Sequence, residues 1–225
     1  IASNNPICLG DSSILTINGD AELYQWSNNL GSGTTVTIYP INNTAYTVTG
    51  TNSYGCTSSA NITITVNPNA DATIKPVPRL CDNSSTIILN ATDTGGVWSG
   101  DGIINETKGL FSPIQAGVGE HIITYTISGQ CGDTDTITIT VYPSPDATAY
   151  ATDETCIDAN DGIAWVVVTG GTPPYSFLWS SYQNMDSIFE LSPGIYNVTV
   201  TDFHNCFDTD TVYIKEGTED CYITH

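Results

Sequence analysis

The spacing of the cysteines constrains the fold of this chain more than any other feature. Seven cysteines occur, at positions 8, 56, 81, 131, 156, 206 and 221. Taken in order, the first six form three pairs that are 48, 50 and 50 residues apart. The first members of these pairs recur after 73 and 75 residues. This period predicts three tandem domains of about 75 residues.

We expect each pair to form a disulfide inside its own domain, which gives the pairs Cys8–Cys56, Cys81–Cys131 and Cys156–Cys206. In the immunoglobulin strand order, however, the two members of a pair would lie at opposite ends of the sandwich. Pairing between domains, or reduced cysteines, is therefore the alternative. Cys221 is the odd member and could pair with a downstream domain or another chain, or stay free. Disulfides indicate an oxidising compartment outside the cytosol.

Alternating apolar and polar residues predict β-strands along the whole chain, as in Ala45–Thr51. Frequent Gly, Pro and Asn residues interrupt these runs and argue against helices. We predict an all-β fold of three tandem Ig-like sandwiches in an extended array, because proline-containing junctions link the domains. The predicted domains are residues 1–68, 69–143 and 144–218, and residues 219–225 form a tail or the lead into a further domain.

The charge balance excludes several classes of partner. The chain carries 24 acidic and 4 basic residues, a formal net charge of −20. Nucleic acids and anionic lipid surfaces both require clusters of Lys and Arg, so neither is expected as a partner. No apolar run reaches the 18 residues or so of a membrane span, so we expect no insertion into a membrane. The sequence starts without a signal peptide, so we expect a processed product or a piece of a longer protein.

Several motifs carry a resemblance to known repeats. Residues 144–218 resemble an SprB repeat through the motifs Asn160-Asp161-Gly162, Gly170–Tyr175, Leu178-Trp179-Ser180 and Val198–Asp202, with His204-Asn205-Cys206 where that family often has Asn-Gly-Cys. Residues 1–68 resemble Ig-like or PKD-like repeats through Tyr24–Ser27 and Gly55-Cys56, and residues 69–143 resemble a PKD-like variant through Trp98–Gly100 and Phe111–Pro113. Such repeats occur in surface adhesins of gliding Bacteroidota. The resemblance implies an extracellular, cell-surface or secreted protein that is exported by the type IX secretion system.

Three sets of residues are candidates for a site. Asp158, Asn160 and Asp161 place oxygen atoms beside a glycine turn and could bind Ca²⁺, although turn chemistry explains the same residues. Thr136, Ser187 and Thr211 each follow Asp and precede an aliphatic residue, a pattern that the resemblance links to O-glycosylation, and chance alone gives as many matches. The segment Ser180–Glu190 has no counterpart in the other repeats, and its Tyr182, Met185 and Phe189 could contact a partner.

The tryptophans Trp26, Trp98 and Trp179 could stack on sugars, but their recurrence once per repeat favours core positions, each packed against the disulfide of its own domain. Trp165 lies in an apolar strand and is also expected in the core.

No catalytic motif is found, and the three histidines have no motif around them. We therefore expect a non-enzymatic structural or adhesive segment of an extracellular surface protein. It would need no cofactor, apart from the Ca²⁺ considered above, and its partners would be a cell-surface or matrix glycan or protein, or copies of itself. The alternatives are an array of glycan-binding modules attached to a secreted hydrolase, and a filament subunit that polymerises by strand addition, for example through Ile1–Leu9, with Cys221 as a lock.

Overall fold

The computed structural model describes residues 1–218, and their fold is all-β, as the sequence predicts. Twenty strands make up the regular structure, and α1 (Pro113–Ala116), a single turn capped by Ser112, is the one helix among these residues. Below, residues 1–68, 69–143 and 144–218 are called the first, second and third segments.

The first segment is a small sandwich. Its strands are β1 (Ile7–Cys8), β2 (Ser13–Thr16), β3 (Leu23–Trp26), β4 (Thr35–Ile38), β5 (Thr44–Thr51), β6 (Thr57–Ile64) and β7 (Val66–Asn67). One sheet pairs β2 with β4, a second has the order β3-β5-β6, and the short strands β1 and β7 pair with each other. This division matches the B–E and C–F–G pairings of an immunoglobulin-like domain. Alternate residues of β5, Tyr46 and Val48, point into a core that also holds Leu15, Trp26 and Ile64.

The second segment follows a similar plan. Its strands are β8 (Leu80–Cys81), β9 (Ile87–Ile88), β10 (Val97–Ser99), β11 (Ile103–Asn105), β12 (Leu110–Phe111), β13 (Gly119–Ile127) and β14 (Asp133–Tyr142). They form sheets of order β10-β13-β14-β8 and β11-β12-β9. The short strand β8 pairs in parallel with the end of β14, just as β1 pairs in parallel with β7 in the first segment.

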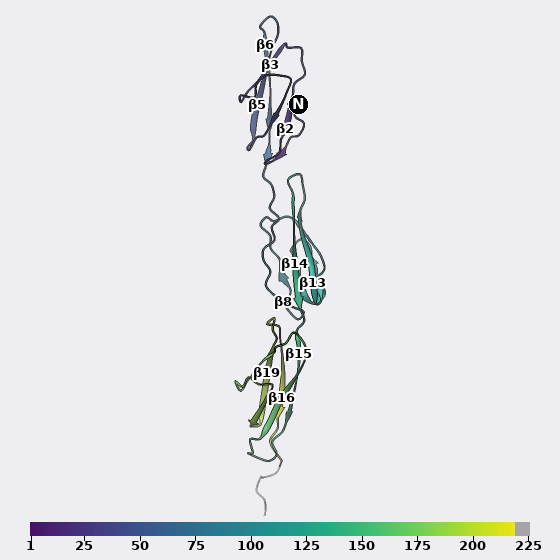
Figure 1. The fold of residues 1–225 in the computed structure, drawn as a ribbon, viewed down its shortest axis with the longest axis vertical. Coiled ribbons are helices and arrows are strands. Elements are labelled where there is room, and N and C mark those ends of the chain that lie inside the picture. Colours follow the sequence, from purple (N-terminus) through teal and green to yellow (C-terminus); the bar gives the residue numbers. More distant parts are fainter. Residues whose placement is uncertain (219–225) are drawn as a thin grey trace, which may run out of the picture. The chain divides into compact units, whose positions relative to one another are not determined.

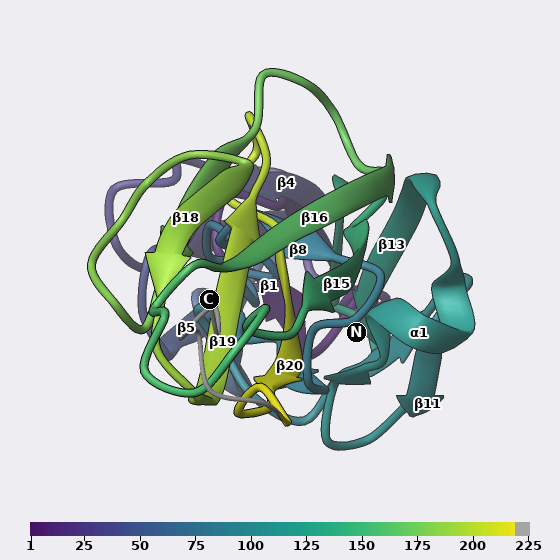
Figure 2. The same cartoon turned by 90° about the horizontal axis from the view of Figure 1, so that it is seen from below.

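The third segment has the most regular strands. They are β15 (Pro145–Thr152), β16 (Gly162–Gly170), β17 (Ser176–Trp179), β18 (Ser187–Leu191), β19 (Gly194–Thr201) and β20 (Phe207–Ile214). The sheets have the orders β15-β16-β18 and β17-β19-β20, and Figure 2 labels five of these strands, β15, β16, β18, β19 and β20. Between them lies a core built around Trp179, Val198, Val200 and Ile214, each at most 1% exposed.

Contacts divide the chain into two compact units, and the division does not follow the predicted domain boundaries. One unit comprises Ile1–Ile74, Ala91–Val97 and Tyr125–Thr136, and the other comprises Lys75–Asn90, Trp98–Thr124 and Ile137 onward. The β13–β14 hairpin, labelled in Figure 1, thus contributes its tip to the first unit. The three-domain division stays a prediction. Residues 69–74, which belong to the second segment, lie in the first unit and contact Asp93 and Asp133 there.

Candidate functional site

Two disulfides connect different segments. Cys8 bonds to Cys131, with Cα atoms 5.5 Å apart, and Cys81 bonds to Cys206, with Cα atoms 5.6 Å apart. The separations in sequence are 123 and 125 residues. The predicted pairs Cys8–Cys56, Cys81–Cys131 and Cys156–Cys206 are therefore wrong, and the alternative of pairing between domains is correct for these four cysteines. Each bond joins the first cysteine of one segment to the second cysteine of the next, and we call this arrangement a staple.

Strand direction explains why a cysteine does not pair inside its own segment. Cys8 lies on β1, which pairs in parallel with β7, so Cys8 is opposite Asn67 at the exit of the first segment. Cys81 is likewise opposite Tyr142 at the exit of the second. The second cysteine of a segment lies in the hairpin before its last long strand, at the other end of that strand. The hairpin of the following segment supplies the partner instead.

The remaining cysteines differ in state. Cys56, in the hairpin between β5 and β6, is an exposed free thiol, contrary to its expected pairing. Cys156 is disulfide-bonded, but not to Cys206, whose partner is Cys81. Cys221, expected to be unpaired or intermolecular, lies outside the described residues.

In the first and third segments, one side chain positions the hairpin cysteine. In the third segment, Asp202 is 5% exposed, and its carboxylate accepts the backbone N–H groups of Thr172, His204 and Cys206, each at 2.9 Å. In the first segment, the exposed Asn52 accepts the N–H groups of Tyr54 and Cys56, each at 3.0 Å. Asn and Asp readily form such turns because their side chains reach backbone donors two residues ahead. The cysteine's position is therefore encoded locally.

Polar and aromatic contacts surround both staples. Near Cys8–Cys131, the Gln130 side-chain amide donates to the carbonyl of Pro6 at 2.7 Å. Near Cys81–Cys206, the Asn83 side chain donates to the carbonyl of Phe207 at 2.9 Å. There the rings of Tyr142 and His204 also stack, with centroids 3.8 Å apart. The disulfides are thus part of packed contacts between successive segments.

Paired aspartates fasten the strand that enters a segment to the strand that ends it. Asp133 and Asp135 accept the backbone N–H groups of Ala72 and Ile74, both at 2.8 Å. In the third segment, Asp208 accepts from Ala147 at 2.9 Å and Asp210 accepts from Ala149 at 2.7 Å. We call each pair an aspartate latch.

An aspartate at the start of a strand also suits a turn or a solvated edge, so its residue type alone does not predict the latch. The signal was available. An Asp-x-Asp motif lies 61 residues after an Asp-Ala-Thr junction in both segments.

The three repeated tryptophans are core residues. Trp26, Trp98 and Trp179 are 5%, 4% and 1% exposed. The indole N–H groups of Trp26 and Trp179 donate to the carbonyls of Gly33 and Met185, each at 2.9 Å. Sugar stacking on these three rings therefore has no basis. The expectation that each tryptophan packs against a disulfide of its own domain is wrong, because both located disulfides join different segments.

Trp165 does not lie in the core. It is only partly buried, between the fully inward-facing neighbours Ala164 and Val166 on β16. Its ring stacks on Tyr150 of β15, with centroids 5.8 Å apart, and Tyr150 is 46% exposed. The expectation of a core position fails because the alternation of β16 places Trp165 on the outer face.

The candidate calcium residues are engaged in hydrogen bonds of their own loop. The Asp161 carboxylate accepts the backbone N–H and the hydroxyl of Thr155, at 2.9 and 2.6 Å. These bonds, led by the hydroxyl, hold the pKa of Asp161 below its ordinary value. The Asn160 side chain donates to the carbonyl of Asp158 and accepts from the hydroxyl of Ser192. Across residues 1–218, no group of three or more His, Cys, Asp or Glu side chains is arranged to hold a metal ion.

The remaining candidate residues lie on strands or at the surface. Thr136 is on β14 and Thr211 on β20, both exposed, whereas Ser187 on β18 is partly buried. Tyr182 is 91%, Met185 65% and Phe189 55% exposed. Phe189 belongs to β18, which pairs with β16, so the predicted contact loop ends earlier than expected. Modification and contact at these residues stay predictions.

Comparison with known proteins identifies one part of the chain. The SprB repeat family model matches residues 148–184, which lie in the third segment. A search of curated proteins found no match. No helix among the described residues has the length and apolar character needed to cross a membrane.

Similar solved structures include titin domains I67–I69, with 12% identity and a TM-score of 0.44, covering 97% of this chain and 98% of that one. The eight N-terminal Ig domains of Down syndrome cell adhesion molecule match with 10% identity and a TM-score of 0.43, covering 96% of this chain. This chain spans 36% of that structure. Together, the SprB match and the Ig-like strand order fit a surface adhesin or structural repeat protein.

Proposed function

We propose that this chain is a structural segment of an extracellular surface protein, an adhesin stalk or filament, and that it transmits force along a stapled array. The observation that carries the proposal is the pair of overlapping staples. The loop closed by Cys8–Cys131 and the loop closed by Cys81–Cys206 share residues 81–131. Successive segments are therefore joined by disulfides in addition to the backbone.

The staples shorten the covalent path that a pulling force can follow. From Ile1, that path covers seven residue steps to Cys8 and crosses the first disulfide to Cys131. It then runs back over fifty steps to Cys81, crosses the second disulfide to Cys206, and covers twelve steps to Thr218. This is about a third of the backbone between the same two residues. A stalk under tension gains resistance to extension from such a connection.

Other features support the same role. The tryptophans once considered for sugar binding are buried, and the two disulfides suit an oxidising extracellular location. The SprB match supports a place at the cell surface, and within this proposal we retain export by the type IX system in a member of the Bacteroidota. We propose no catalytic activity.

Single-molecule stretching between residues 1 and 218 tests the mechanical role. With the disulfides oxidised, the fully extended length should be roughly 240 Å, and after reduction it should be roughly 760 Å, at about 3.5 Å per residue. Equal lengths in the two states would contradict the proposal. Protease treatment of intact source cells tests location, since a surface protein should be cleaved without lysis.

A second candidate function is glycan binding at the Tyr150–Trp165 pair on the outer face of β15 and β16. Exposed aromatic rings offer apolar faces on which a sugar can stack. Glycan-array binding that Trp165→Ala abolishes would favour this function. Unchanged binding in that variant would exclude this pair as the site.

A further inference from the structure

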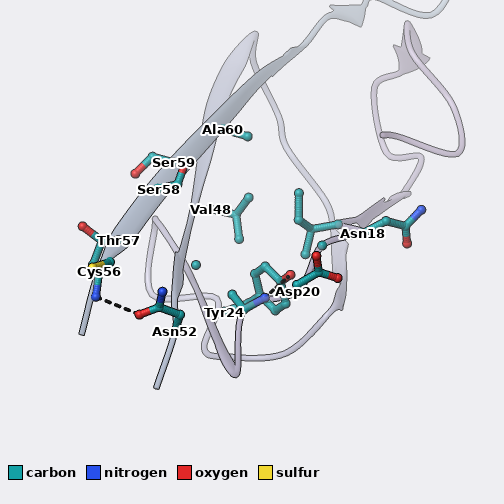
Figure 3. A pocket seen from close by; sticks show the side chains of 14 residues that line it. Asn18, Asp20, Tyr24, Val48, Asn52, Cys56, Thr57, Ser58, Ser59 and Ala60 are labelled. Atoms are coloured by element: carbon teal, nitrogen blue, oxygen red, sulfur yellow. Dashed lines mark hydrogen bonds between the residues drawn. The ribbon is translucent and has the colours of Figure 1, made fainter. Parts of the chain in front are cut away.

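The first segment contains an open groove between two walls. It has a volume of about 430 Å³. One wall is Cys56–Ala60 at the start of β6, and the other is Ile17–Ala21 after β2. Figure 3 shows Ser58 and Ala60 on one side and Asn18 and Asp20 on the other, with Val48 and Tyr24 between them.

In the second segment an extended strand lies between the equivalent walls. Thr73 and Lys75 pair with the chain opposite: Thr92 N–H donates to the Thr73 carbonyl, and Lys75 N–H donates to the Asn90 carbonyl. From the other side, the latch residues Asp133 and Asp135 accept the N–H groups of the same strand. In the third segment, β15 lies between β16 and the latch Asp208–Asp210 in the same way.

The walls of the groove are the counterparts of these partners. Ser58 lies two residues after Cys56, as Asp133 lies two residues after Cys131 and Asp208 two after Cys206. Ala2 forms an isolated antiparallel bridge with Leu15, as Ile74 does with Ala91. In this register the groove corresponds to the slot that Asp71-Ala72 occupies in the second segment and Asp146-Ala147 in the third.

The hairpin cysteine gives a second, independent indication. Cys131 and Cys206 are each bonded to the segment before them, and the Ala70 N–H of the entering strand donates to the carbonyl of Cys131 at 2.9 Å. Cys56 lines the groove, has the same place in its hairpin, and is free. Among residues 1–218, the free hairpin cysteine thus lies beside the open groove.

We propose that this groove binds the exit strand of another Ig-like repeat of the same type, a strand that ends in Asp-Ala. The strand would pair with the edge of residues 17–19 and pass Cys56, which would place Cys56 next to the first cysteine of that repeat. This inference is independent of the mechanical role, because it concerns occupancy of one groove and not resistance to force.

The test uses the chain's own exit strand as a probe. An end-blocked peptide with the sequence of Val66–Ala72 is titrated into the full chain, and binding is followed by NMR shifts of residues 17–21 and 56–60 and by the alkylation rate of Cys56. We expect shifts confined to the two walls and slower alkylation. Ser58→Asp, which supplies the carboxylate found at Asp133 and Asp208, should bind the peptide roughly tenfold more tightly.

Two variants of β6 separate groove binding from surface binding. Ser58→Trp fills the groove and should abolish binding. Thr63→Trp is the matched control, because Thr63 is an exposed residue of β6 that does not line the groove, and this variant should bind normally. Circular dichroism and thermal melting confirm that each variant is folded.

Three results would overturn the proposal: no shift at the walls, equal binding by the Ser58→Trp variant, or preferential binding of a peptide with the sequence of residues 217–225. The last result would make the tail of a second copy the occupant. Wall shifts with the exit peptide that Ser58→Trp removes would support it.

Discussion

The hairpins that carry Cys56 and Cys206 have nearly the same local structure and different surroundings. Both contain a five-residue turn in which the side chain of Asn52 or Asp202 accepts the backbone N–H of the cysteine four residues later. Cys206 is completely buried and bonded to Cys81, whereas Cys56 is exposed and free. The comparison shows that the turn forms from its own sequence, and that burial and bonding come from the segment that precedes it.

The entering strands differ in the same way. The second and third segments hold theirs with aspartate latches, while the first has Ser58 at the corresponding position and an open groove. Contacts between segments are therefore the variable part of this structure, and the sandwich itself is the constant part. Substitutions in the staple, the turns and the latch test this difference.

Removal of the staple should have the largest effect. Replacing both Cys81 and Cys206 with alanine releases a loop of about 125 residues, which the chain-entropy model values at up to about 5 kcal/mol. Cys56→Ser should leave the free energy of unfolding almost unchanged, because its thiol is exposed and unbonded. Urea denaturation measures both. Comparable losses in the two variants would contradict the difference between the hairpins.

Substitution of the turn residues Asp202 and Asn52 should have the second-largest effect on stability. Asp202→Ala leaves three backbone N–H groups without their buried acceptor and should cost about 3 kcal/mol. Asn52→Ala removes two bonds at an exposed site and should cost less than about 1 kcal/mol. Thermal unfolding gives both values. A larger loss for Asn52→Ala would show that the first hairpin depends on its turn more than its exposure suggests.

The latch should have a smaller effect. Asp208→Ala should cost about 1.5 kcal/mol and increase hydrogen exchange at the Ala147 amide, whose acceptor it removes. Ser58→Ala, the matched change in the first segment, should have almost no effect on stability. If exchange at Ala147 stays slow in Asp208→Ala, the latch does not hold the entering strand.

The smallest effect concerns the turn near Cys156. The Asp161 carboxylate has a lowered pKa, so its bonds to Thr155 stabilise the loop above the ordinary pKa of Asp. That contribution is lost as the pH falls through the lower pKa of the folded state. Thr155→Val removes the hydroxyl donor and should move the NMR titration midpoint of Asp161 upward. An unchanged midpoint would mean that the hydroxyl bond does not set this pKa.

Much of the fold could be predicted because its signals are local. Alternation in β5 and β14, the repeated tryptophans, and the Gly and Pro turns all follow from residues close together in sequence. The cysteine period likewise revealed the repeat. The core position expected for Trp165 was wrong because β16 has apolar residues on both faces. The sequence of such a strand does not indicate which of its two faces is covered by the rest of the domain.

The connections between segments were harder to predict because they depend on which ends of two sandwiches meet. The similar spacings of Cys8–Cys56 and Cys81–Cys131, 48 and 50 residues, favoured pairing within a repeat, but the parallel strands β1 and β8 place the first cysteine at the exit. The opposite-ends argument from the immunoglobulin strand order was the correct one. The Asp-x-Asp latch was hidden because aspartates at a strand start also suit a solvated edge.

Disulfide mapping tests the central claim, that staples join successive segments. The chain is alkylated under non-reducing conditions, digested with a protease, and analysed by mass spectrometry. We predict one linked pair of peptides containing Cys8 and Cys131, another containing Cys81 and Cys206, and an alkylated Cys56. Linked peptides containing Cys8 with Cys56, or Cys81 with Cys131, would contradict the account.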